Sequence, residues 1–353
     1  MRRLMIVILL ILTAFLSATA DASDGKERSA TVTVEILLNA PKDVTSVRLW
    51  IPYPMSDAEQ TITKVHVSGN YGAAVVYSEP LYGDTALFSH WKGAQAERKL
   101  VYSFHVTRRE HSAVPIAPDS RPASKKEFKK YLALTDSRET NAKLAQYASL
   151  ITVGKKTELE KARSVYDWVV DNMVRDPNVK GCGLGDVEKL LTTRSGKCAD
   201  ISSVFVALAR AAGIPAREVF GIRIPGGSQG DMTKAQHCWA EFYLYGNGWI
   251  PVDPADVRKI ILEKKLTIQE AAPYREYYFG KVDENRIAFG TGRTITLNPP
   301  QKSEPLNYFM YPYAEADGKP LNEDLFGFNI GYRIQFREDG TISGFVPPGK
   351  SDA

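Results

Sequence analysis

The residues with the clearest chemical meaning in this sequence are a cysteine, a histidine and an aspartate that follow one another at wide spacing: Cys198, His237 and Asp253. A thiol becomes a nucleophile when a base removes its proton, and an imidazole can do this near neutral pH. A carboxylate that bonds to the imidazole holds its tautomer and stabilises the imidazolium. These three residues therefore predict nucleophilic attack on a carbonyl group through a covalent thioester.

The surroundings of Cys198 predict an activated thiol. Cys198 follows Ser195, Gly196 and Lys197, and an apolar series at helical spacing begins at Ile201. We therefore expect Cys198 in the first turn of a helix, where the helix dipole and free N–H groups lower a thiol pKa and can stabilise an oxyanion. The alternative is a buried structural cysteine. It is disfavoured because the aliphatic series already supplies the inward face of the helix.

A predicted hairpin places His237 and Asp253. One strand begins at His237, a second covers residues 249–252, and a glycine-containing turn at residues 246–248 joins them. A loop of about five residues would put Asp253 opposite His237, and a tighter turn would displace it along the strand. In both cases the carboxylate can reach the imidazole. The alternative for Asp253 is a turn aspartate before a proline.

Two helices are expected to support these strands. Thr157 and Glu160 form a capping-box pattern, and apolar residues at helical spacing continue from there to Met173. The second helix starts near Lys197 and ends where Gly213 interrupts the pattern. Helices of this kind beside antiparallel strands indicate the α+β class.

The first third of the chain is typical of β structure. Alternating polar and apolar residues between turn residues predict five strands, over residues 30–38, 46–51, 61–67, 73–77 and 99–106. Such a series indicates a small all-β sandwich, and no group of polar side chains in it suggests chemistry. Pro115, Pro118 and Pro122 then indicate a linker to the helical part.

The N-terminus has the pattern of a secretory signal peptide. Two arginines precede the 13-residue run Leu4–Leu16, which is apolar apart from Thr13, and Ala18 and Ala20 provide small residues for cleavage after Ala20. The run is shorter than the roughly 20 residues that cross a bilayer. We therefore expect a periplasmic or secreted protein with no stable membrane span after cleavage.

Charge and composition disfavour several kinds of partner. The formal net charge of +4 falls to +2 when residues 1–20, with two arginines and no acid, are removed. Charges of both signs are interspersed, so nucleic acid and anionic lipid surfaces are not expected partners. The sequence has no calcium-binding loop, no zinc-finger spacing among its three cysteines and no phosphate-binding glycine loop. We expect no cofactor and no metal ion.

Three segments around the candidate residues resemble the transglutaminase-like superfamily. They are Ser195–Asp200 with Leu208–Arg217, His237–Glu241 and Gly248–Asp253, in the order that the family has. The resemblance extends from about Glu127 to Arg337. The β-rich N-terminal region is only loosely similar to domains that accompany this family.

The resemblance implies a papain-like fold, with helices packed on an antiparallel sheet, and acyl transfer through a thioester. It implies that Cys198 is the nucleophile, His237 the base and Asp253 the orienting acid. Family members include protein cross-linkers, peptidases and amidases. We expect an exported enzyme that acts on peptide or carboxamide bonds of a protein or peptide, including cell-envelope peptides, with hydrolysis favoured. The alternatives are a protein-glutamine transglutaminase and a non-catalytic cell-envelope binding module.

The length and composition of the mature chain suit two domains, because 44% hydrophobic content can supply two cores. The division that we predict comprises a signal peptide in residues 1–20, a β-sandwich-like domain in 21–115, a transglutaminase-like catalytic domain in 116–337 and a C-terminal tail in 338–353.

Cys182 and Cys238 are left without a catalytic use. In an oxidising compartment they are candidates to pair with each other. Cys238 would face away from the cleft if His237 faces it, because successive side chains on a strand point to opposite faces. The alternative is two small apolar side chains buried apart. Cysteine spacing alone leaves both interpretations open.

Overall fold

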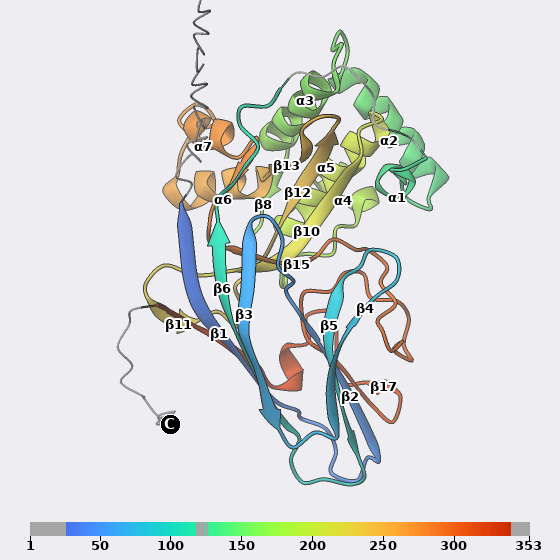
Figure 1. Ribbon diagram of the computed structural model, residues 1–353. Helices are drawn as coiled ribbons and strands as arrows, with labels where there is room; N and C mark the ends of the chain where they lie inside the picture. The colour runs from blue at the N-terminus through green and yellow to red at the C-terminus, as the bar shows by residue number, and fades with distance from the viewer. Residues whose placement is uncertain (1–25, 118–123, 125, 340–353) are drawn as a thin grey trace, which may run out of the picture.

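A computed structural model describes residues 26–117, 124 and 126–339. The helices gather around one sheet in the upper part of Figure 1, and a β-sandwich forms the lower part. The predicted signal peptide, the linker residues Pro118 and Pro122 and nearly all of the predicted tail lie outside the described residues. None of the helices within the described ranges has the length and apolar character that crossing a bilayer requires.

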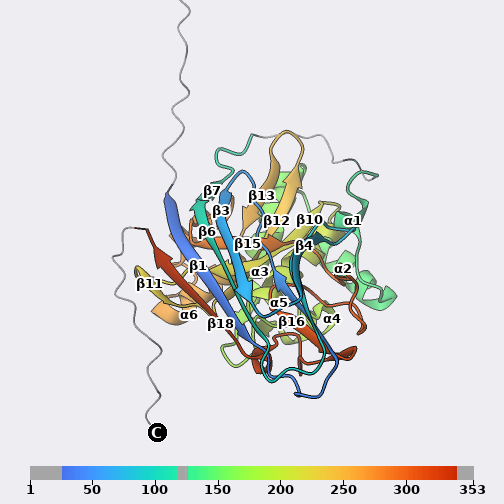
Figure 2. The same cartoon turned by 60° about the horizontal axis from the view of Figure 1, so that its bottom comes forward.

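The sandwich consists of two five-stranded antiparallel sheets. One has the strand order β11-β18-β1-β6-β3, whose members lie side by side in Figure 2, and the other has the order β17-β16-β2-β5-β4. The strands of the first sheet are β11 (Gln229–Asp231), β18 (Tyr332–Glu338), β1 (Glu27–Leu37), β6 (Lys99–Arg109) and β3 (Gln60–Gly69). Those of the second are β17 (Lys319–Pro320), β16 (Tyr313–Ala316), β2 (Ser46–Pro52), β5 (Thr85–Lys92) and β4 (Ala73–Ser78).

Alternation along the strands builds the sandwich core. In β1, Ala30, Val32, Val34 and Ile36 are buried, while the residues between them are partly or fully exposed. The five predicted N-terminal strands are all present. Strand β5 was not predicted. Its burial alternates from Leu87 onward, but three apolar residues follow one another at 86–88, so the residue types do not show the period of two.

Strands from the C-terminal part of the chain complete both sheets of the sandwich. Strand β18 pairs antiparallel with β1, so that Val34 lies opposite Ile334, and β16 pairs with β2. The β-rich half therefore takes strands from both sides of the helical half in the sequence. The domain boundaries given above stay a prediction.

The second half is built on the antiparallel sheet β13-β12-β10-β15. Its strands are β13 (Gly248–Val252), β12 (Gln236–Leu244), β10 (Ala216–Arg223) and β15 (Arg286–Gly290). Helix α5 (Cys198–Ala211) packs against β12 and β10, and its residues 198–209 are all buried. An apolar helix surrounded by other elements in this way forms the centre of a core.

The remaining elements surround α5 and the sheet. The other helices are α1 (Lys129–Leu132), α2 (Arg138–Ile151), α3 (Glu158–Asn172), α4 (Val187–Thr193), α6 (Pro254–Lys264), α7 (Ala272–Tyr277) and the 3-10 turn η1 (Phe328–Ile330). Short strands are β7 (His111–Ser112), β8 (Val174–Arg175), β9 (Ser195–Gly196) and β14 (Lys281–Val282). Helix α3 begins with the predicted capping box, in which Thr157 and Glu160 each bond to the backbone of the other. The predicted α+β fold class is confirmed.

Candidate active site

Cys198 is the first residue of α5, and backbone contacts fix its position. The carboxylate of Asp200 accepts hydrogen bonds from the N–H of Lys197 at 2.9 Å and of Gly185 at 2.8 Å, which ties the preceding loop to the helix start. The N–H of Ala199 donates to the carbonyl of Cys182 at 2.9 Å. The N–H of Cys198 itself has no acceptor within the described part of the chain. It is available to an oxyanion that forms beside the sulfur.

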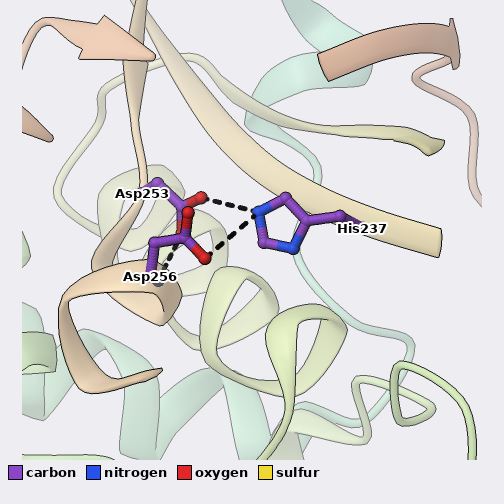
Figure 3. A group of neighbouring side chains, drawn as sticks. All are labelled: His237, Asp253 and Asp256. Atoms are coloured by element: carbon purple, nitrogen blue, oxygen red, sulfur yellow. Dashed lines mark hydrogen bonds and ion pairs between the residues drawn. The ribbon is translucent and has the colours of Figure 1, made fainter. Parts of the chain in front are cut away.

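His237 and Asp253 are brought together by the hairpin of β12 and β13. Val252 pairs with Ala240, so Asp253 does not lie opposite His237, and the tighter of the two expected turns is the one that occurs. The side chains still meet: Nε2 of His237 lies 2.8 Å from Oδ2 of Asp253 (Figure 3). Because Nε2 is engaged, Nδ1 is the ring nitrogen left for a thiol.

Asp253 also caps helix α6. Its Oδ1 accepts the N–H of Asp256 at 2.8 Å, and its own N–H donates to the carbonyl of Tyr278 at 3.0 Å. One carboxylate oxygen therefore fixes the helix while the other faces the imidazole. The sequence interpretation of Asp253 as a turn residue before proline describes the first of these contacts, and both contacts coexist.

A buried charge network surrounds this pair. Arg286, which has no exposed surface, donates to Oδ2 of Asp253, to Asp256 at 2.7 Å and to Asp283 at 3.0 Å. Arg223 donates to both oxygens of the Asp256 carboxylate, one of which also accepts from Arg286. Three carboxylates thus face two guanidinium groups, so a proton on His237 would make the group electrically neutral.

The network sets the direction of the His237 pKa. Burial alone would lower this pKa, but the charge of Asp256, 3.7 Å away, and then that of Asp253 raise it above its usual value. The pKa of Asp256 is held well below its usual range, against the effect of burial, by Arg223, His237 and Arg286. The imidazolium form is therefore favoured at this position.

The three cysteines lie together and are all free and buried. Hydrogen bonds from Cys182 and Cys238, with a smaller contribution from His237, hold the pKa of Cys198 well below its usual range, although burial opposes this. The hydrogen bond with Cys198 and burial keep the pKa of Cys182 well above its usual range. Burial, and then the hydrogen bond with Cys198, also keep the pKa of Cys238 well above its usual range. Among the three thiols, Cys198 is thus the one whose ionisation is favoured.

This arrangement differs from both expectations for the two spare cysteines. They form no disulfide in the structure, and they are not buried apart, because both contact Cys198. The Cys182 sulfur also lies 3.2 Å from the carbonyl oxygen of Gln236, so its single S–H proton has two acceptors within reach, this oxygen and the Cys198 sulfur. A thiol that donates must keep its proton, which agrees with the direction of its pKa.

His237, Asp253 and Asp256 bring three ligand atoms within 4.8 Å of one another. The same carboxylates are already bonded to the guanidinium groups of Arg286 and Arg223. A cation placed among them would meet these positive charges at short range. We therefore interpret the group as an ion-pair network and assign no metal ion to it.

Cys198 and His237 line a cleft of about 970 Å³, which also contains residues of β10, α6 and the segments before β1 and β15. Both side chains are largely buried, with 3% of Cys198 and 7% of His237 exposed, so they lie at its floor. The volume is in the usual range for a small-molecule or peptide side-chain site.

Sequence reasoning found the three candidate residues and missed Asp256, Asp283, Arg223 and Arg286. Asp256 has a local signal, because an acidic residue three positions after a helix cap belongs to the first turn of a helix. Arg286 has none. Nothing in its neighbourhood indicates that it would be buried against carboxylates from another element.

Comparison with known proteins identifies the relatives of the chain. The family model of the transglutaminase-like superfamily matches residues 145–254. An uncharacterized protein of Haemophilus influenzae is 40% identical over 302 residues, which cover 78% of this chain and 82% of the relative.

One solved structure has a similar fold. A candidate cysteine protease from Cytophaga hutchinsonii is similar with a TM-score of 0.51 and 15% identity, over 88% of this chain and 98% of that one. The periplasmic domain of TgpA from Pseudomonas aeruginosa has a TM-score of 0.36 and 16% identity, over 66% of this chain and 90% of that one.

The network predicts a large stability effect at Arg286. Replacing it with leucine leaves buried carboxylates without their partner, and we expect the free energy of unfolding to fall by about 3–5 kcal/mol in urea denaturation. Arg333→Leu is the control, because Arg333 forms an exposed pair with Asp231 at 3.1 Å. Its loss should cost less than about 1 kcal/mol. Equal losses in both variants would contradict the interpretation.

Proposed function

Since the chain belongs to the transglutaminase-like superfamily, we propose that it is a cysteine-dependent acyl-transfer enzyme whose nucleophile, base and orienting acid are Cys198, His237 and Asp253. The observation that carries the proposal is that His237, which lines the same cleft as Cys198, makes a 2.8 Å contact with the buried Asp253. A nucleophile, a base and a group that orients the base are the parts that acyl transfer needs.

The first half of the reaction forms a thioester. The Cys198 thiolate attacks the carbonyl carbon of a carboxamide or peptide bond, and the oxygen takes the negative charge beside the free N–H of Cys198. The His237 imidazolium then gives its Nδ1 proton to the leaving nitrogen, which departs as ammonia from a carboxamide or as an amine from a peptide bond. Asp253 and Asp256 stabilise the charged ring until this transfer.

The second half releases the acyl group. Neutral His237 removes a proton from an acceptor, which attacks the thioester carbon and restores the Cys198 thiolate and the imidazolium. We propose that water is the favoured acceptor, so that the enzyme is a peptidase or amidase. Water is always present at an open cleft, whereas selection of an amine requires a shaped acceptor channel. A protein-glutamine transglutaminase is the alternative.

We further propose that the protein is exported and acts in the periplasm or outside the cell, on the strength of the leader pattern in residues 1–20. N-terminal sequencing of protein recovered from the cell envelope should then begin at Asp21. Full-length protein confined to the cytoplasm would exclude this location.

An assay with a glutamine-containing peptide and a labelled primary amine separates the two kinds of acceptor. We expect mass spectrometry to detect the hydrolysed peptide in excess over the amine adduct, with both products absent for Cys198→Ala. Predominant adduct at low amine concentration would support cross-linking in place of hydrolysis.

Covalent labelling tests the assignment of the nucleophile. Iodoacetamide should alkylate the wild-type protein at Cys198 in tryptic peptide mapping, and Cys198→Ala should abolish the fast phase. Cys182→Ala and Cys238→Ala each remove a buried neighbouring thiol that lowers the pKa of Cys198, so they should slow labelling but leave Cys198 as the labelled residue. Fast labelling that survives in Cys198→Ala would assign the nucleophile elsewhere. Absence of fast labelling in every protein would favour the non-catalytic binding module.

The pH dependence of this labelling follows from the two pKa directions. The pKa of Cys198 is lowered and that of His237 is raised, so the charged pair should persist below neutral pH. An ordinary thiol is less than about 1% ionised at pH 6, so a fast rate at that pH distinguishes Cys198. His237→Ala removes a positive charge beside the thiolate. It should therefore slow labelling more at pH 6 than at pH 9, and Asp253→Asn should have a smaller effect in the same direction.

A further inference from the structure

The cleft around Cys198 is lined unevenly by charge. Seven lysine and arginine residues line it, against two acidic residues, Asp283 and Glu284. The whole chain, in contrast, has 45 basic and 41 acidic residues. Positive charge is therefore concentrated at this opening, and a concave site lined by one sign of charge concentrates ligands of the opposite sign.

Two of the seven cations are neutralised within the fold. Arg223 bonds to Asp256, as described above, and lies 3.5 Å from a carboxylate oxygen of Asp283. Arg28 bonds to Glu338 at 2.6 Å and to three backbone carbonyls in residues 224–227. These two side chains shape the wall of the cleft, and their charges are already matched by protein groups.

The charges of the other five cations are paired weakly, or not at all, with acidic side chains. Lys259 lies 3.8 Å from Glu263, a partly exposed contact. Lys26, Arg175, Lys197 and Lys234 form no ion pair with any residue in the described ranges. Asp283, the first acidic residue of the lining, is bonded to Arg286 and Arg223. The cleft therefore keeps an excess of unpaired positive charge after the internal pairs are taken into account.

Three of these cations lie on or beside segments that lead to Cys198 or His237. Lys197 directly precedes Cys198, and Lys234 lies three residues before His237. Arg175 belongs to β8, whose pairing partner β9 leads into the start of α5. The side of the cleft formed by α6 and α7 supplies Ile260, Tyr274 and Tyr277, which offer apolar and aromatic surface. An extended peptide could thus place carboxylates on one side and apolar groups on the other.

We propose that this cleft selects acidic peptides, with a carboxylate of the substrate held by Lys234 and Arg175 next to the bond that Cys198 attacks. The inference rests on the proposed function, since it names the substrate class of the same site. A peptide is favoured over other polyanions because attack by a thiolate requires an acyl carbon. The carboxylate can belong to an aspartate or glutamate side chain or to the C-terminus of the peptide.

Two alkylating reagents of similar size test the charge of the site. Iodoacetate and iodoacetamide both alkylate the thiolate through their CH2 carbon, with iodide as the leaving group. Only iodoacetate is an anion. The rate of labelling by iodoacetamide reports how much thiolate is available, so the ratio of the two rates isolates the effect of charge. The ratio should fall about fivefold or more in Arg175→Glu/Lys234→Glu relative to wild type.

The variants are chosen so that a folding defect is recognised. Lys234 is exposed, so Lys234→Glu alone should fold and should lower the ratio by a smaller factor in the same direction. Lys319→Glu, at an exposed position of β17 in the sandwich, reverses a charge away from the cleft lining and should leave the ratio unchanged. An unchanged ratio in both Lys234→Glu and the double variant would overturn the inference, while labelling of Cys198 in them would leave the proposed function intact. Failure of both reagents to modify wild-type Cys198 would instead count against the proposed function.

Peptide binding identifies the source of the carboxylate. Fluorescence anisotropy on Cys198→Ala, which cannot turn over, compares an amidated peptide with internal glutamates, its glutamine counterpart with a free C-terminus, and a peptide with neither. Tighter binding of the first assigns a side-chain carboxylate, and tighter binding of the second assigns the C-terminal carboxylate. In either case the advantage should shrink as ionic strength rises. Equal binding of all three peptides would overturn the inference.

Discussion

The need to pair buried charges governs the half of the molecule that holds the candidate active site. Arg286 has no contact with solvent and is bonded to carboxylates of Asp253, Asp256 and Asp283. Moving such groups out of water is unfavourable unless each charge meets an opposite one. The edge strand β15, which begins at Arg286, is therefore fixed against the start of α6. Asp253, which bonds His237, caps the same helix. The contacts that neutralise the buried charges therefore also hold β15 and α6 together beside His237.

The same contacts also explain why the pKa of His237 is raised while the pKa of Cys198 is lowered. The carboxylates outnumber the guanidinium groups around His237, which favours a positive ring, and two protonated thiols surround the sulfur of Cys198, which favours a negative one. Burial opposes both shifts, and the charge of Arg223 opposes the shift of His237, but the carboxylates and the thiol hydrogen bonds outweigh these effects. Cys182 and Cys238 thus have a use that does not involve a disulfide, since a bridge between them would remove both thiol protons.

Local patterns in the sequence were sufficient for much of the fold. The capping box at Thr157, the start of α5 at Cys198 and the period of two in β1 each depend on residues that are close in sequence. The contacts that were missed are long-range. Arg286 meets Asp253 across 33 positions. A Cys182–Cys238 bridge and burial of the two thiols apart were both left open, and neither occurs: α5 packs on the face of β12 where Cys238 is buried, so the start of the helix reaches it. The hairpin register was left open because it depends on turn geometry.

The pairing of β1 with β18 has a consequence for synthesis. Val34 and Ile334 are opposite each other, so a ribosome must add about 300 residues between the two partners before the sheet can close. Until then, one edge of β1 offers unpaired backbone groups that invite association with other chains. A truncated product that lacks residues 332–338 would keep every candidate catalytic residue and still expose that edge. Assistance by chaperones, and removal of incomplete chains by proteases, would therefore matter more for this protein than for one whose strands pair with near neighbours.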